Sequence, residues 1–161
     1  MSININLRVQ KKNENGTYET MDHLSKPEWY TSNIFAFLAG VRNVSMITPL
    51  SKPRGLPLDL LEQSKNYKIS FPSQCYTHDS FIDEFFDCWS PNVHSVSWLF
   101  IDELLSVDYS QMVENRSIDG VTVPKNHGVM MSLEDVIGKQ FIKDIQNFHK
   151  EGAHRIVFCF D

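Results

Sequence analysis

The C-terminal segment constrains the fold most, because an amphipathic helix pattern leads into a strand that is apolar on both faces. From 132 to 150, apolar residues recur with the 3.6-residue period of a helix that buries one side, and Ser132 is placed to cap its start. Gly138 lies inside this pattern at a cost of up to about 1 kcal/mol relative to alanine. Gly152 ends the pattern, and after Arg155 the residues 156–160 carry apolar side chains in succession. We therefore predict one helix over 132–150 and a central strand that is covered on both faces.

The N-terminus predicts a β-hairpin. Residues 3–10 alternate strictly between apolar and polar, which is the period of a half-buried strand. Asn15 and Gly16 offer a tight turn, after which 17–21 returns as the partner strand. A chain of 161 residues is most simply one domain. We predict an α+β fold over 1–161, with this hairpin, a central sheet that includes the C-terminal strand, and several packed helices.

The middle of the chain predicts shorter elements. Apolar spacing and turn residues set their bounds, and residues 75–92 fit helical spacing but lack clear caps. We expect helices over 32–40 (capped by Ser32), 58–67 and 100–107, strands over 68–71, 93–98 and 121–123, and a loop over 44–57.

Charge and cysteine content limit the partners and the compartment. The formal net charge is −5 at pH 7, and the 15 basic residues are scattered, which disfavours a nucleic-acid duplex as a stable partner. No apolar run is long enough to cross a membrane, and the opening residues lack the apolar block of a secretory signal. The three cysteines include no Cys-x-x-Cys pair. We therefore expect a cytoplasmic protein with free thiols and no membrane partner.

Two arginines lie next to residues that shape the backbone. Arg42 and Asn43 follow Gly40, where a cation either stabilises the helix end or presents a planar fork to a phosphate or carboxylate. Arg54 and Gly55 lie in a turn with a proline on each side. Such a turn holds an arginine with little entropy left to lose on binding, although a plain surface loop is the alternative.

A third polar segment is aromatic. In an extended chain, His94 and Trp98 lie on one side while Ser95 and Ser97 lie on the other. An imidazole and an indole on the same side suit a planar ligand. The alternative is a buried tryptophan beside a hydrogen-bonded histidine.

Motifs of known chemistry are missing from the sequence. It contains no Gly-rich phosphate loop, no dinucleotide turn and no Gly-x-Ser-x-Gly elbow. The adjacent His78 and Asp79 lack a second cluster of metal ligands at a fixed offset. We expect no catalytic residue, no metal and no cofactor, and a binding protein rather than an enzyme.

Several segments together carry a resemblance: 33–43, 53–57, 94–99, 103–105 and 155–161. In combination they resemble a family of small uncharacterised proteins encoded by tailed bacteriophages and prophages. The resemblance implies an accessory, anti-defence protein that acts against host functions in the cytoplasm of an infected bacterium. Small phage proteins that sequester nucleotide signals of host immunity are similar in size, charge and compartment.

Our first hypothesis is a protein that binds and sequesters a small anionic nucleotide-like molecule, such as a host immune signal, without turnover. Arg42 and Arg54 would bind phosphate, and Trp98 or Tyr30 would stack on a base. The sequence leaves the formation of a homo-oligomer open. The predicted ligand-binding residues are Tyr30, Asn33, Arg42, Asn43, Arg54, Gly55, His94, Ser95, Ser97 and Trp98.

Two alternatives belong to other classes. One is a small metal-assisted hydrolase or nuclease acting on a nucleotide through His94 with Asp79 or Asp102. The other is an inhibitor of a host protein that uses an exposed aromatic patch. The residues expected in that patch are Phe81, Phe85, Phe86 and Trp89.

Overall fold

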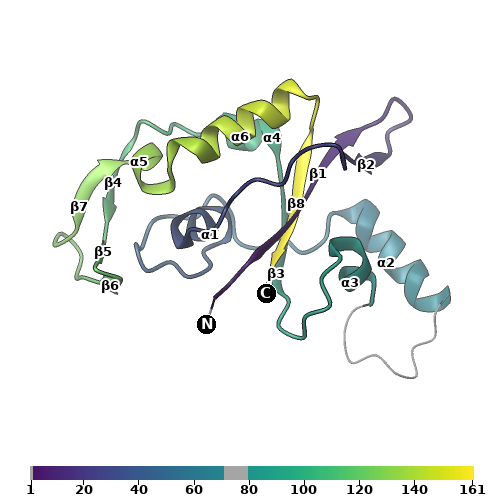
Figure 1. The fold of residues 1–161 in the computed structure, drawn as a ribbon, viewed down its shortest axis with the longest axis horizontal. Coiled ribbons are helices and arrows are strands. Elements are labelled where there is room, and N and C mark those ends of the chain that lie inside the picture. The colour runs from purple at the N-terminus through teal and green to yellow at the C-terminus, as the bar shows by residue number, and fades with distance from the viewer. Residues whose placement is uncertain (1, 71–79) are drawn as a thin grey trace.

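A four-stranded antiparallel sheet forms the centre of the protein (Figure 1). The structure is a computed structural model that describes residues 2–70 and 80–161. The strands are β1 (Ile5–Lys12), β2 (Tyr18–Thr20), β3 (His94–Phe100) and β8 (Arg155–Phe160). Their order across the sheet is β2-β1-β8-β3, so the predicted central position of the C-terminal strand is confirmed. Every residue of β8 is buried.

The N-terminal hairpin is confirmed as well. Lys12 pairs with Tyr18 at its closed end, and the Asn13 amide donates to the Thr17 carbonyl at 2.7 Å. Gly16 has a φ of 84°, a left-handed value that suits glycine in a tight turn. The hairpin therefore forms where the sequence places its turn.

Helices cover both faces of the sheet (Figure 1). Phe158 and Phe160 of β8 belong to a core shared with one group of helices, while Val157 and Cys159 belong to a core shared with the other. The first group is α1 (Ser32–Ala39), α4 (Ile101–Leu105), α5 (Leu133–Ile137) and α6 (Lys139–Lys150), and the second is α2 (Leu58–Ser70) and α3 (Ser80–Phe86). In the parts of the chain that the structure describes, every helix is too short or too polar to cross a lipid bilayer.

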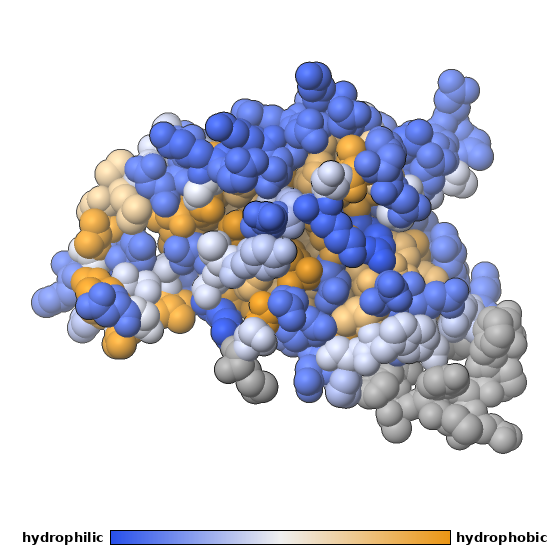
Figure 2. Space-filling view, viewed as in Figure 1, coloured by the Kyte–Doolittle hydropathy of each residue, from blue (hydrophilic) through white to orange (hydrophobic). Residues whose placement is uncertain are grey.

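Two small ribbons form an arm at the end of the molecule opposite α2 (Figure 1). In the first ribbon β4 (Met112–Asn115) pairs with β7 (Val129–Ser132). In the second, β5 (Ser117–Ile118) pairs with β6 (Val121–Thr122), close to the strand expected at 121–123. Figure 2 shows apolar surface gathered over this end, whereas polar surface covers α6.

The single helix predicted over 132–150 is wrong, because Gly138 divides it into α5 and α6. Ser132 caps α5 as expected, accepting a bond from the Asp135 amide at 3.1 Å. Gly138 then takes φ 93° and ψ 140°, a conformation that only glycine adopts readily. This turn redirects the chain, so that α5 continues from the arm while α6 leads back toward the start of β8 (Figure 1).

Other predicted bounds also change. The cap of α1 is Thr31 and not Ser32, since the Thr31 hydroxyl accepts from the Ile34 amide. The strand expected at 68–71 is wrong for 68–70, which end α2, and Phe71 lies outside the described residues. The expected helix over 100–107 is shorter, and helical spacing within 75–92 corresponds to α3.

An ion pair between the buried Arg155 of β8 and Asp59 of α2 links this helix to the sheet. Arg155, only 2% exposed, donates from both terminal nitrogens to the Asp59 carboxylate at 2.7 Å. Its Nε donates to Gln10 at 2.8 Å, and its guanidinium lies 3.5 Å from the centre of the Tyr18 ring. The hydrogen bonds from Arg155 lower the pKa of Asp59, which keeps this carboxylate charged.

Candidate functional site

The turn that carries Arg54 lies along the outer edge of β3. The Gly55 amide donates to the Val96 carbonyl at 2.8 Å, and the Arg54 amide donates to the Ser97 hydroxyl at 3.0 Å. Gly55 has a φ of 77°, which explains the glycine at this point of the loop. The loop thus covers an edge of the sheet that would otherwise be open.

Arg54 is exposed, but its side chain is already paired with groups of the protein itself. Its two terminal nitrogens donate to the Glu103 carboxylate at 2.8 and 2.6 Å, and its guanidinium lies 4.8 Å from the centre of the Trp98 ring. The hydrogen bonds between Arg54 and Glu103 raise the pKa of the arginine and lower the pKa of the glutamate. A ligand phosphate at this place would have to displace a bidentate carboxylate.

The structure brings only part of the predicted site together. Arg54, Gly55, Ser97 and Trp98 meet at the edge of β3, and Trp98 packs against the core that includes α2 and α3. Asn33 lies in α1, whose helix belongs to the other core. The ten predicted residues therefore do not line a single recess.

The two asparagines hold the backbone around α1. Asn33 donates to the Val136 carbonyl at 3.0 Å and accepts from the Ser45 hydroxyl at 2.6 Å. The amide group of Asn43 bonds to both the N–H and the carbonyl of Ile47, which closes the loop between them. These contacts give both residues a structural role in holding the loops around α1.

Of the remaining predicted residues, Ser95 is half-buried and the others are exposed. His94 is exposed, its Nδ1 lies 2.9 Å from the Ser95 hydroxyl, and its ring stacks on Phe160. Ser95 has a φ of 54° at an irregularity in the β3–β8 pairing. Arg42 is exposed in the turn after α1, and Tyr30, before that helix, is 74% exposed.

The aromatic patch expected for a protein inhibitor is wrong. Phe81 and Phe86 are buried in the core beneath α3, and Phe85 packs against that core. Trp89 is exposed at 64%. The helical spacing of these aromatic residues therefore reflects their burial against the sheet. Of the four, only Trp89 is exposed.

Metal and thiol chemistry gain no support from the described residues. Residues 2–70 and 80–161 contain no group of three or more histidine, cysteine or acidic side chains that could hold a metal, and His78 and Asp79 fall outside them. Cys88 and Cys159 are free and buried. Burial raises the pKa of both thiols, to about 12 for Cys159, and protonated thiols are poor nucleophiles.

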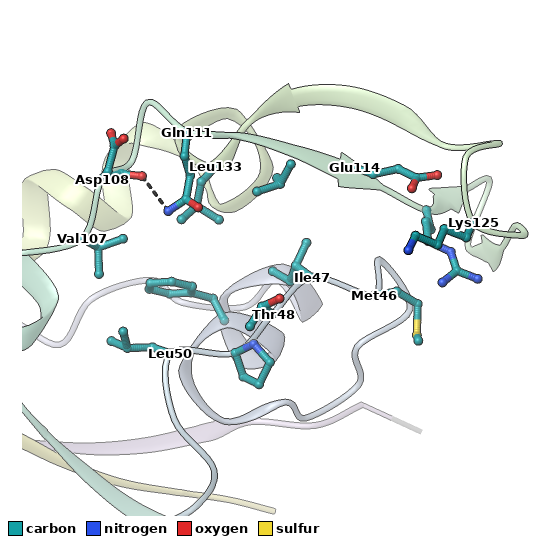
Figure 3. A pocket seen from close by; sticks show the side chains of 14 residues that line it. Met46, Ile47, Thr48, Leu50, Val107, Asp108, Gln111, Glu114, Lys125 and Leu133 are labelled. Carbon is teal, nitrogen blue, oxygen red and sulfur yellow. Dashed lines mark hydrogen bonds between the residues drawn. The ribbon is translucent and has the colours of Figure 1, made fainter.

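A cleft of about 740 Å³ lies between the loop after α1 and the arm (Figure 3). Its apolar wall includes Ile47, Leu50, Val107 and Leu133. The polar side chains along it are Thr48, Asp108, Gln111, Glu114, Arg116 and Lys125. An apolar wall with a few polar groups is the usual make-up of a small-molecule site.

Charge is unevenly placed along this cleft. Lys125 and Glu114 lie at the end toward the arm, and Asp108 and Gln111 lie at the opposite end (Figure 3). Arg116 lies between β4 and β5 and is fixed there, because its Nε donates to the Val123 carbonyl at 2.8 Å. Glu114 accepts a hydrogen bond from the Gly128 amide at 2.9 Å, and its single carboxylate faces two cations, Arg116 and Lys125. The arm end therefore favours an anionic group, and the other end favours hydrogen-bond donors.

None of the ten predicted residues lines this cleft. Its walls come from the loops around 46–50 and 107–111, from β4 with the neighbouring Arg116, from Lys125, and from Phe37 of α1 and Leu133 of α5. The only signal in the sequence is a pair of cations, Arg116 and Lys125, in the weakly patterned region before the C-terminal helix pattern.

No protein-family model matches the chain, and searches among curated proteins and solved structures give no match either. The function of this protein is therefore inferred from its own geometry.

Proposed function

We propose that this protein binds a small anionic, nucleotide-like molecule in the cleft beside the arm and holds it without turnover. The cleft itself carries the proposal: it joins an apolar wall to two cationic side chains, Arg116 and Lys125, at one end. Its volume of about 740 Å³ lies within the range of small-molecule sites.

The distribution of polar groups favours a nucleotide over a simple anion. A nucleotide carries phosphate at one end and an apolar-faced base with N–H donors at the other. Lys125 and Arg116 suit the phosphate. The carboxylate of Asp108 and the side-chain amide of Gln111 suit the base. The apolar wall between them suits the flat ring.

The lining favours binding over catalysis. Both carboxylates of the lining are already engaged: Asp108 accepts from the amide and the hydroxyl of Ser110, and Glu114 accepts from the Gly128 amide. A protein that sequesters a ligand needs affinity alone. That role agrees with the anti-defence accessory function implied by the phage resemblance, which we retain as part of the proposal.

Titration calorimetry against a panel of mononucleotides, cyclic nucleotides and ADP-ribose tests the proposal. We expect Lys125→Glu to weaken binding by about tenfold or more, because it places a carboxylate where the phosphate would lie. Thr48→Trp, which fills the cleft with a ring, should abolish binding. Lys143→Glu makes the same charge change on the exposed face of α6 and serves as the matched control.

Arg54→Ala distinguishes the cleft from the site expected at β3. If the ligand binds in the cleft, this variant should keep its affinity. Loss of binding would instead indicate a site at Arg54 and Trp98. Ligand recovered intact after incubation with Mg²⁺ separates sequestration from hydrolysis. If no nucleotide binds, or if Lys125→Glu and Lys143→Glu behave alike, the proposal is wrong.

A further inference from the structure

The two walls of the cleft are joined at the end toward the arm. The Thr122 hydroxyl of β6 donates to the Val44 carbonyl at 2.7 Å. The Arg116 amide donates to the Ser45 carbonyl at 3.0 Å. Arg116 lines one wall of the cleft, and Met46, which follows Ser45, lines the other. These bonds therefore close the cleft where Arg116 lies, and we call this its closed end.

Arg116 is held in place at the closed end. Besides the bond from its amide, its carbonyl accepts from the Val123 amide at 2.8 Å, and its Nε donates to the Val123 carbonyl at 2.8 Å. The residue is half-buried. The N–H groups on the two terminal nitrogens of a guanidinium remain for a ligand when Nε is used in this way. A fork that is already positioned loses little conformational entropy when it binds an anion.

A second cation lies beside this fork. Lys125 comes two residues after Val123, and Figure 3 shows it at the same end of the cleft, near Glu114. In the part of the chain that the structure describes, neither Arg116 nor Lys125 forms a salt bridge. Neighbouring cations repel each other, and a bound anion would remove that repulsion.

This closed end suits a terminal phosphate better than a phosphodiester. A phosphate monoester has three free oxygens and a charge of about −1.5 to −2 at pH 7, and it ends the molecule that carries it. A diester has two free oxygens and a single negative charge, and its chain continues on both sides. Two cations at a closed end match the charge and the shape of the monoester.

We propose that the ligand of the cleft carries a terminal phosphate monoester, as a nucleoside 5′-monophosphate does, and that Arg116 and Lys125 bind this group. The inference rests on the function proposed above and narrows it to one class of nucleotide. The Arg116 fork would bond two of the phosphate oxygens and the Lys125 ammonium the third. Cyclic nucleotides and dinucleotides joined by a phosphodiester should bind more weakly.

Titration calorimetry with matched ligands tests this inference. The probes are the common nucleoside 5′-monophosphates, their phosphate monomethyl esters and the parent nucleosides. Each methyl ester keeps the base and the sugar but has one charge and one free oxygen fewer than its parent. We expect the wild type to bind at least one monophosphate about tenfold or more tightly than the methyl ester of that monophosphate.

Three variants assign the preference to the closed end. Lys125→Gln should reduce it to about threefold or less, because one of the two cations is gone. Glu114→Gln should increase it, because a carboxylate at this end repels a doubly charged phosphate more than a singly charged one. Lys143→Gln removes a cation from the exposed face of α6, outside the lining of the cleft, and serves as the matched control. Circular dichroism verifies that the variants keep their helix content.

The outcomes separate this inference from the proposed function. Equal binding of each monophosphate and its methyl ester would overturn the inference, while the proposed function would stand if Lys125→Glu still weakens both. A preference that persists in Lys125→Gln as it does in Lys143→Gln would overturn the inference as well. If no probe binds at all, the proposed function is wrong and the inference falls with it.

Discussion

The ion pair between Arg155 and Asp59 should contribute unequally to stability when either partner is replaced, because only the arginine is buried. The Arg155 side chain is 3% exposed and the Asp59 side chain 39%. Asp59→Ala leaves a guanidinium charge inside the protein with Gln10 and Tyr18 around it. Removing one partner of a buried ion pair costs about 3–5 kcal/mol. Because water already reaches Asp59 and will hydrate part of the uncovered charge, we expect about 3 kcal/mol.

Replacing the arginine should cost less. Arg155→Met removes the buried charge, fills similar volume and frees Asp59 to regain water, so the main loss is the bond to Gln10, about 1–2 kcal/mol. The double variant should then be more stable than Asp59→Ala alone, because it no longer holds an uncompensated charge. Arg155→Met should therefore lower the free energy of unfolding of the wild type but raise that of Asp59→Ala.

Urea unfolding, followed by tryptophan fluorescence, measures each free energy of unfolding. Arg155 lowers the pKa of Asp59 in the folded protein, so the stabilisation from the pair is full above the ordinary aspartate pKa of about 3.9. It is lost as the pH falls through the lower folded-state value. The difference between wild type and Asp59→Ala should therefore shrink on acidification. A constant difference, or additive effects of the two substitutions, would refute the reasoning.

Two further predictions concern the buried thiols and the break between α5 and α6. In a Cys75→Ser background, Cys88 and Cys159 should react with a chromogenic thiol reagent only as fast as the protein unfolds, since burial and a raised pKa keep both protonated; rapid labelling of the folded protein would contradict this. Gly138→Ala should lower the free energy of unfolding by about 1–3 kcal/mol, because φ 93° strains any side chain although no atom lies within 4 Å of the added methyl group. Urea unfolding measures this loss, and an unchanged midpoint would show that the chain relaxes into one continuous helix.

The sheet could be predicted because its signals are local. Successive apolar residues place β8 inside, and strict alternation with Asn15-Gly16 places the hairpin. The break at Gly138 was visible as an unfavourable residue in a helix. Periodicity alone could not show that the glycine turns the chain, because the apolar spacing continues on both sides.

The site could not be predicted in the same way, because its contacts join distant segments. Nothing local to Arg54 shows that Glu103, 49 residues away, satisfies its guanidinium. The polar groups of Asn33 and Asn43 are likewise used by backbone atoms brought near by folding. The cleft joins loop residues to a few residues of α1, β4 and α5, so no single periodic segment of the sequence marks it. The sequence shows which side chains are able to bind a ligand. Only the folded structure shows which of them already bond to other parts of the protein.

The position of β8 has a consequence for how the chain assembles. Ile5 pairs with Phe160, and Ser97 pairs with Phe158 from the other side, so both neighbours of β8 are translated before it. On the ribosome, β1 and β3 have no strand between them until β8 emerges. Pairing across such long sequence separations is slow, because loop closure must precede the contacts that reward it. The nascent chain can therefore complete this sheet only after β8 has been synthesised and has paired with both β1 and β3.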